Sequence, residues 1–240
     1  MKQSSILLFI LFAAMQLQCS CLSSRSTIKK NEYGLAVVSN KREYRKTTST
    51  DSSRKMVALS SYLKPMNTDW QYATVNNFTK QILYKKPDAY LRMEAAIALQ
   101  KASEELKTKG LGFKIFDAYR PYSVTKKMWS VVPDENYAAN PAKGSGHNRG
   151  AAIDLTLYSL QTGKELTMPT PFDDFTEKAH HDYWQLDSLV LINRQILKDI
   201  MVKYGFLPLA TEWWHYYLPN AAHRFELMDL NFKEMKKIVK

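Results

Sequence analysis

Hydrophobic residues recur at helical spacing in two long stretches of the chain. In the first, alanines and leucines fall on one face of a segment rich in glutamate, which predicts a helix from Tyr90 to Lys107. Gly110 follows, and glycine commonly ends a helix. In the second, isoleucines, a leucine and a methionine share one face from Ile192 to Tyr204, and Gly205 comes directly after this stretch.

Other stretches show the two-residue period of half-buried strands. Phe113 and Ile115 mark one strand, and the residues from Ala151 to Leu157 mark another. The aromatic stretch from Phe206 to Leu218 has a β-like pattern as well. Pro121 favours the first turn of a further helix, whose buried side would include Val124 and Met128.

These elements follow one another in an irregular order and not as repeated βαβ units. Such an order favours an α+β fold in which helices flank an antiparallel sheet within a single domain. The residues from Pro133 to Ser145 are predicted to form a loop, because they include Pro141 and Gly144.

The chain changes character near its N-terminus. Lys2 precedes an apolar stretch, Ile6 to Met15, which has the length of a signal-peptide core and is too short to span a bilayer. Residues 1–21 are therefore expected to be an export signal. Residues 22–55 are rich in Ser, Thr, Lys and Arg and predict a flexible tether, with Leu35 to Val38 as an exception, and residues 56–240 form the folded domain.

Both cysteines lie at the end of the leader. Cys21 follows a small residue, Ser20, so lipid attachment there would anchor a lipoprotein to a membrane, although Gln18 and Cys19 match the usual lipobox poorly. Plain secretion is the alternative. In either case the protein is expected in the periplasm or cell envelope. A folded domain without cysteine has no thiol nucleophile or disulfide, and any metal must be held by His, Asp or Glu.

The net charge of +11 does not indicate a nucleic-acid partner. Residues 22–55 hold nine Lys and Arg against three acids, which gives +6, and Lys2 adds one, so residues 56–240 carry only +4. The domain has no glycine-rich phosphate loop and no recognisable nucleic-acid-binding motif.

Two histidines lie in settings that suggest a metal site. His147 follows a Gly-Ser-Gly run, with Asp154 seven residues later on the predicted strand, and His215 ends the sequence Glu-Trp-Trp-His. Two imidazoles and one carboxylate can bind zinc and leave a fourth position for water, whose proton Glu212 could accept. Each signal alone is also typical of a hydrogen-bonding loop histidine, an ion-paired acid or an aromatic core edge.

Three separated stretches resemble the zinc-dependent D-alanyl-D-alanine dipeptidases, and they occur in that family's order. They are Phe116 to Pro121, Ser145 to Leu157 and Glu212 to Tyr216. The resemblance extends from about Tyr72 to Tyr217. Part of the middle motif is shared with zinc D,D-carboxypeptidases, whereas the match through the two tryptophans favours the dipeptidases.

The resemblance implies one zinc ion per chain and a role for each matching residue. His147, Asp154 and His215 would be the zinc ligands, Glu212 the general base, and Arg120 the group that stabilises the oxyanion. It also implies a D,D-dipeptide substrate.

The resemblance further implies residues around the substrate. Ser145 and Asp173 would hold its free ammonium, and Tyr72 and Asp117 would line or support the site. Arg120 paired with Asp117 at a helix start is the alternative without the family context. His180, His181 and His223 are expected to be structural or surface residues.

The chain departs from the family pattern at several positions. Gly146 and Ala118 replace a serine and a glycine, and Pro169 and Pro171 stiffen the segment before Asp173, which could change the choice of substrate. Two alternatives to a dipeptidase remain: a D,D-carboxypeptidase acting on longer wall peptides, and a lipoprotein that binds wall fragments without cleaving them.

Overall fold

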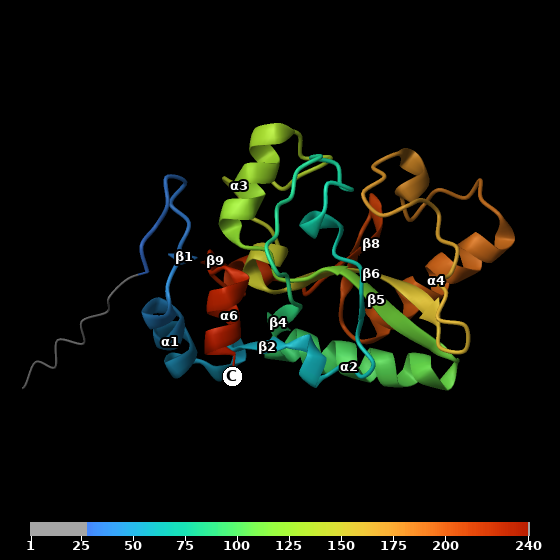
Figure 1. Ribbon diagram of the computed structural model, residues 1–240, viewed down its shortest axis with the longest axis horizontal. Helices are drawn as coiled ribbons and strands as arrows, with labels where there is room; N and C mark the ends of the chain where they lie inside the picture. Colours follow the sequence, from blue (N-terminus) through green and yellow to red (C-terminus); the bar gives the residue numbers. More distant parts are fainter. Residues whose placement is uncertain (1–27, 240) are drawn as a thin grey trace, which may run out of the picture.

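The computed structural model describes residues 28–239, and its centre is a five-stranded sheet (Figure 1). Its strands lie in the order β3, β5, β6, β8, β7, and all neighbours are antiparallel except β3 and β5. The strands are β3 (Asn67–Thr68), β5 (Leu111–Asp117), β6 (Ala152–Ser159), β7 (Leu207–Leu209) and β8 (Glu212–Tyr217). The predicted α+β fold is confirmed, with one short parallel strand at the edge.

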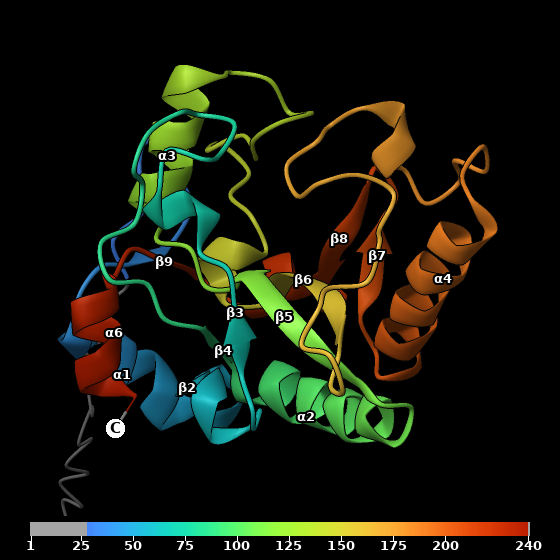
Figure 2. The same ribbon diagram turned by 45° about the vertical axis from the view of Figure 1, so that its right-hand side comes forward.

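Two helices, α2 (Met93–Thr108) and α4 (Ser188–Lys203), cover one face of this sheet (Figure 2). Each has an apolar side that is fully buried, such as Leu99 in α2 and Leu197 in α4, and the two helices also pack against each other. Burying a leucine side chain contributes about 1.5–3 kcal/mol, so these faces fix the helices on the sheet.

The start of α2 differs from the sequence prediction. Residues Tyr90–Arg92 form the strand β4, which pairs antiparallel with β2 (Met56–Ala58), and the helix begins only at Met93. The apolar spacing of Leu91 suits the helix, but its backbone hydrogen bonds go to the neighbouring strand, and tertiary pairing overrides helix propensity here. Helix α4 begins at Ser188, four residues earlier than predicted.

The opposite face of the sheet carries α3 (Tyr122–Val131) and the long loops that follow β5 and β6 (Figure 1). Pro121 directly precedes the first turn of α3, where a helix was predicted to begin, and Met128 is fully buried. Residues 133–145 contain no helix or strand, which confirms the predicted loop.

The predicted tether is wrong for its described part, residues 28–55. Strand β1 (Val37–Val38) pairs with β9 (Leu227–Met228), so the N-terminal segment lies beside the C-terminal part of the chain (Figure 1). Helix α1 (Lys41–Thr50) follows. The short helices α5 (Ala221–Arg224) and α6 (Phe232–Ile238) complete the C-terminal part.

A helix cap and two buried side chains, which the overall composition does not reveal, explain why residues 28–55 fold. The Asn40 side chain accepts a hydrogen bond from the backbone of Glu43 and caps α1. Val38 and Tyr44 are buried, and the Tyr44 hydroxyl accepts a hydrogen bond of 2.8 Å from the Met56 backbone. Two buried side chains and one cap outweigh a composition typical of disorder.

The predicted leader, including Cys19 and Cys21, lies outside the described residues. Among residues 28–239, no helix combines the length and the apolar character required to cross a bilayer.

Replacing Tyr44 by Phe tests whether residues 28–55 are docked. The change leaves the buried Met56 N–H without its acceptor, and we expect the free energy of unfolding to fall by about 1–3 kcal/mol. Urea unfolding measures it, with Tyr33→Phe at an exposed tyrosine as the matched control. Equal midpoints for both variants and the parent protein would show that the segment is an undocked tether.

Candidate metal and active site

The register of three central strands places acidic and histidine side chains in one row. Asp117 on β5 is the cross-strand partner of Asp154 on β6, and Asp154 is in turn the partner of His215 on β8. Directly paired residues point to the same face and lie about 4.5–5.5 Å apart at their Cβ atoms. The sheet alone therefore brings together two residues that are 61 positions apart in the sequence.

His147 joins this row from the turn before β6. It begins the single helical turn His147–Arg149, which Gly150 ends in a left-handed conformation at φ 66°. The positive φ favours glycine here, and a Cβ atom at this position would also require the end of the Met56 side chain, 2.5 Å away, to move. The turn brings the imidazole back over Asp154.

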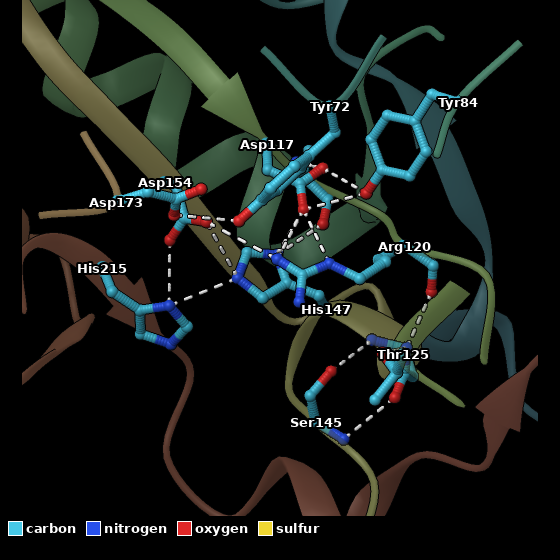
Figure 3. Close-up of polar contacts among 12 residues, drawn as sticks. Tyr72, Tyr84, Asp117, Arg120, Thr125, Ser145, His147, Asp154, Asp173 and His215 are labelled. Carbon is cyan, nitrogen blue, oxygen red and sulfur yellow. Dashed lines mark hydrogen bonds and ion pairs between the residues drawn. The ribbon is translucent and has the colours of Figure 1, made fainter. Parts of the chain in front are cut away.

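The three side chains predicted to bind zinc meet in space (Figure 3). His147 Nε2 lies 3.3 Å from Asp154 Oδ2 and 3.2 Å from His215 Nδ1, and His215 Nδ1 lies 2.9 Å from Asp154 Oδ1. An ion with tetrahedral bonds of about 2.0–2.1 Å separates its ligand atoms by roughly 3.3 Å. The spacing and the nitrogen and oxygen donors therefore fit a small tetrahedral cation such as zinc.

Neighbouring groups set the protonation states of His147 and Asp154 that metal binding requires. The carbonyl oxygen of Ala118 accepts a bond of 2.6 Å from Nδ1–H of His147, which fixes the tautomer and leaves Nε2 with its lone pair towards Asp154. Burial alone would raise the pKa of Asp154, but the imidazoles of His147 and His215 hold it below its ordinary value. Asp154 is thus a carboxylate at neutral pH, the form that binds metal.

Glu212 faces the same cavity because β8 is irregular. In a regular strand, residues three apart point to opposite faces, but the pairing of β7 with β8 shifts between Pro208 and Leu209. As a result Glu212 Oε2 lies 3.8 Å from His215 Nδ1. Burial raises the pKa of Glu212 above its usual value, which suits a group that must both take up and release a proton.

Arg120 is held from behind by a buried network. Asp117 Oδ2 accepts hydrogen bonds from Nε of Arg120 at 2.9 Å and forms an ion pair with Nη2 at 2.8 Å. The Tyr84 hydroxyl contacts both Asp117 oxygens at 2.9 and 3.0 Å. The guanidinium also lies 5.2 Å from the ring centre of Tyr72 and 3.9 Å from Asp154.

The structure distinguishes two of the predicted residues. Arg120 lines the cavity, whereas Asp117 does not and lies behind it, so Asp117 supports the site and does not contact a ligand in the cavity. Tyr84 is a residue that the sequence reasoning missed. It lies in a segment without regular secondary structure, where no motif or spacing connects it with Asp117, 33 positions away.

Asp173 presents one unpaired oxygen. Its backbone adopts φ 62°, which is uncommon for a residue other than glycine, directly after the segment that contains Pro169 and Pro171. Tyr72 donates a hydrogen bond of 3.0 Å to Oδ1, while Oδ2 is buried with no hydrogen-bond partner among residues 28–239. Burial raises the pKa of Asp173 well above its ordinary value, because the charged form of a buried carboxyl group is poorly solvated.

A cavity of about 180 Å³ connects these groups. This is below the roughly 300–1,000 Å³ typical of pockets for drug-sized molecules, so the space suits a small substrate. Eight of the nine predicted site residues line it, namely Tyr72, Arg120, Ser145, His147, Asp154, Asp173, Glu212 and His215. Tyr137, Phe175 and Trp214 add aromatic walls that the sequence reasoning did not assign.

The other histidines do not line this cavity. His181 is buried beside the Tyr216 ring, at 6.0 Å between ring centres, and Tyr216 is a neighbour of His215 in β8. Burial lowers the pKa of His181 to about 4, so the ring is neutral near pH 7.

Comparison with known proteins identifies the family. Residues 52–238 match the Peptidase M15 family model described as D-ala-D-ala dipeptidase. The chain belongs to this family. The predicted resemblance is thereby confirmed, and the protein is an enzyme, a hydrolase of the metallopeptidase class.

Two relatives are similar over most of their length. The chain is 34% identical over 168 residues to the D-alanyl-D-alanine dipeptidase of Escherichia coli K12, which covers 70% of this chain and 86% of the relative. It is 32% identical over 185 residues to the D-alanyl-D-alanine dipeptidase of Enterococcus faecium. This match covers 69% of this chain and 92% of the relative.

A solved structure is also similar in part. It is a vancomycin resistance D,D-pentapeptidase in complex with Zn(II), with 14% identity, 59% coverage of this chain, 80% coverage of that chain and a TM-score of 0.37. A similarity at this level adds no weight to the family assignment.

Proposed function

We propose that this protein is a zinc-dependent dipeptidase that hydrolyses D-alanyl-D-alanine and related D,D-dipeptides of the bacterial cell wall. The observation that carries the proposal is one small cavity that holds the converging triad of His147, Asp154 and His215 together with Glu212 and the unpaired oxygen of Asp173. The activity named for its relatives supports this assignment.

His147, Asp154 and His215 would hold one zinc ion per chain. Bound zinc supplies Lewis acidity, because it lowers the pKa of a coordinated water towards about 7 and polarises a carbonyl oxygen. Two imidazole nitrogens and one carboxylate are ligands that zinc takes in catalytic sites, where a fourth position stays open for water.

Glu212 would act as the general base and then as the general acid. Its carboxylate takes the proton from the attacking water and passes it to the nitrogen of the leaving D-alanine, so that the amine departs neutral. Partial burial favours this exchange, because it holds the pKa of Glu212 closer to neutrality than that of an exposed glutamate.

Arg120 would stabilise the negative charge that develops on the carbonyl oxygen during attack. Asp117 and Tyr84 fix the guanidinium in advance, so little reorganisation is needed when the charge forms. A fixed cation in a buried site contributes more than the same cation in water.

Asp173 and Ser145 would hold the free ammonium of the dipeptide. The buried Oδ2 of Asp173 lacks a partner among the described residues, and an ammonium satisfies it with a charge-assisted hydrogen bond. Tyr72 keeps the other carboxylate oxygen in place. Recognition of the amino end favours a dipeptidase over a carboxypeptidase, because a longer peptide has no ammonium at this position.

We further propose that the protein is exported and acts in wall turnover or scavenging in the cell envelope, with Cys21 as an optional lipid anchor. The basic residue and apolar stretch at the N-terminus support export. A resistance role would require the enzyme where the dipeptide is made. Protein recovered from the cytoplasm with an intact N-terminus would overturn this part.

Glu212→Ala tests the proposed chemistry. We expect the variant to keep its zinc and to lose at least about 100-fold in the rate of D-Ala release, because the proton carrier is absent. Zinc content by mass spectrometry and D-Ala release are measured together, with the exposed Glu177→Ala as control. A parent protein that binds the dipeptide but is already inert would instead support the non-catalytic wall-fragment-binding alternative.

Asp173→Asn tests recognition of the amino end. Asparagine tolerates the positive φ, so the fold should persist while kcat/KM for D-Ala-D-Ala falls about 10- to 100-fold through loss of a charge-assisted hydrogen bond. The neighbouring Asp174→Asn, which does not line the cavity, should have little effect. N-acetylated D-Ala-D-Ala should not be cleaved by the parent protein. Undiminished turnover of the acetylated dipeptide or of a pentapeptide would favour the carboxypeptidase alternative.

A further inference from the structure

The side-chain amide of Asn148 connects two segments that line the cavity. It is completely buried, directly after His147 in the turn that precedes β6. The loop that carries Ser145 and the segment that carries Arg120 both form hydrogen bonds to it. The bond to Arg120 cannot be recognised from sequence spacing, because Arg120 lies 28 positions away.

One side of the amide orients Ser145. The backbone N–H of Ser145 donates to Asn148 Oδ1 at 3.0 Å, and the backbone N–H of Asn148 donates to Ser145 Oγ at 3.1 Å. This reciprocal pair occupies one lone pair of the serine hydroxyl and fixes its rotamer. The second lone pair remains available for a donor in the cavity that Ser145 lines.

The other side of the amide holds the backbone of Arg120. Asn148 Nδ2 donates to the Arg120 carbonyl at 3.0 Å and to Thr125 Oγ1 at 2.8 Å, which uses both of its hydrogens. The backbone N–H of Arg120 donates to the His147 carbonyl at 3.2 Å. The Arg120 backbone is thus bound on both sides, close to Ser145 and Thr125 (Figure 3).

The network admits only one orientation of the amide. A flipped side chain would bring its oxygen against the Arg120 carbonyl oxygen and its nitrogen against the Ser145 N–H, and both contacts would repel. Asparagine has the shortest side chain that offers one acceptor to the Ser145 loop and two donors to the segment of Arg120 and Thr125. Aspartate has the same shape but lacks the donors.

We propose that Asn148 is a positioning residue that fixes Ser145 relative to Arg120, so that the ammonium and the reacting carbonyl of the first D-alanine are held at the same time. This inference rests on the proposed function, because it assigns Ser145 to the ammonium and Arg120 to the oxyanion. Misplacement of such groups by about 1 Å can cost 100-fold in rate.

Two substitutions separate the two sides of the amide. Asn148→Asp keeps the acceptor for Ser145 but puts an oxygen against the Arg120 carbonyl, so kcat should fall about 10- to 100-fold while KM stays within about threefold. Asn148→Ala removes both sides, so KM for D-Ala-D-Ala should also rise about tenfold. Thr125→Val is the matched control, because it removes one buried hydrogen bond of the same amide but touches neither Ser145 nor Arg120.

The experiment measures kcat, KM, zinc content and melting temperature for the parent protein and the three variants. A structural role alone would lower the melting temperature of Thr125→Val and Asn148→Asp alike and would not separate kcat from KM. Three results overturn the inference: kinetic constants within threefold of the parent in both Asn148 variants, an equal loss of kcat in Thr125→Val, or loss of zinc as the source of the effect. Should Asn148→Ala fail to fold, Asn148→Ser takes its place.

Failure of the proposed function is distinguishable from failure of this inference. A zinc-loaded parent protein that releases no D-Ala refutes the dipeptidase assignment whatever the variants do. Calorimetric affinity for D-Ala-D-Ala then decides the inference on its own: about tenfold weaker binding by Asn148→Ala with little change in Asn148→Asp supports it, and equal affinities overturn it.

Discussion

A carboxylate buried between two imidazoles at the centre of the sheet is the constraint on which the rest of the site depends. The Asp154 side chain is only 3% exposed, and its oxygens lie 3.3 Å and 2.9 Å from His147 and His215. A buried charge is costly unless it is paired or bound to a metal. The register of β5, β6 and β8 keeps these groups together, and therefore the fold of the sheet and the chemistry of the cavity are parts of one arrangement.

Around this centre, Arg120 and His147 are each fixed by residues that do not line the cavity. Asp117 and Tyr84 hold the guanidinium of Arg120, and the Ala118 carbonyl sets the tautomer of His147. Such supports fix polar groups before the substrate arrives, which lowers the cost of reorganisation during the reaction. Asp173 differs from these groups, because one of its buried oxygens has no hydrogen-bond partner among residues 28–239.

Residues in local motifs could be predicted as candidates from the sequence. The turn before β6 and the first part of β8 each carry their residues within a few positions of one another, so spacing and resemblance predicted His147, Asp154, Glu212 and His215, and the structure places all four around one cavity. The role of Tyr84 could not be predicted in this way, because its contact with Asp117 spans 33 positions and depends on how a loop without regular structure packs.

The fold was predictable to a similar extent. Apolar periodicity located α2 and α4, but not the first three residues of the predicted helix, which pair with β2 instead. Composition misled for residues 28–55, because a few buried contacts, such as Tyr44 with the Met56 backbone, decide the outcome among many polar residues. The spacing of apolar residues predicts helices with long buried faces, but it does not predict single contacts such as the one between Tyr44 and the Met56 backbone.

The central claim is that Asp154, His147 and His215 form one metal site, and zinc stoichiometry tests it most directly. Mass spectrometry of the folded parent protein, equilibrated with zinc and then freed of excess ion, should find one zinc per chain. The isosteric Asp154→Asn should bind far less, because the amide lacks the charge that balances the ion. Absence of zinc from the parent protein, or equal zinc in the variant, would contradict the account.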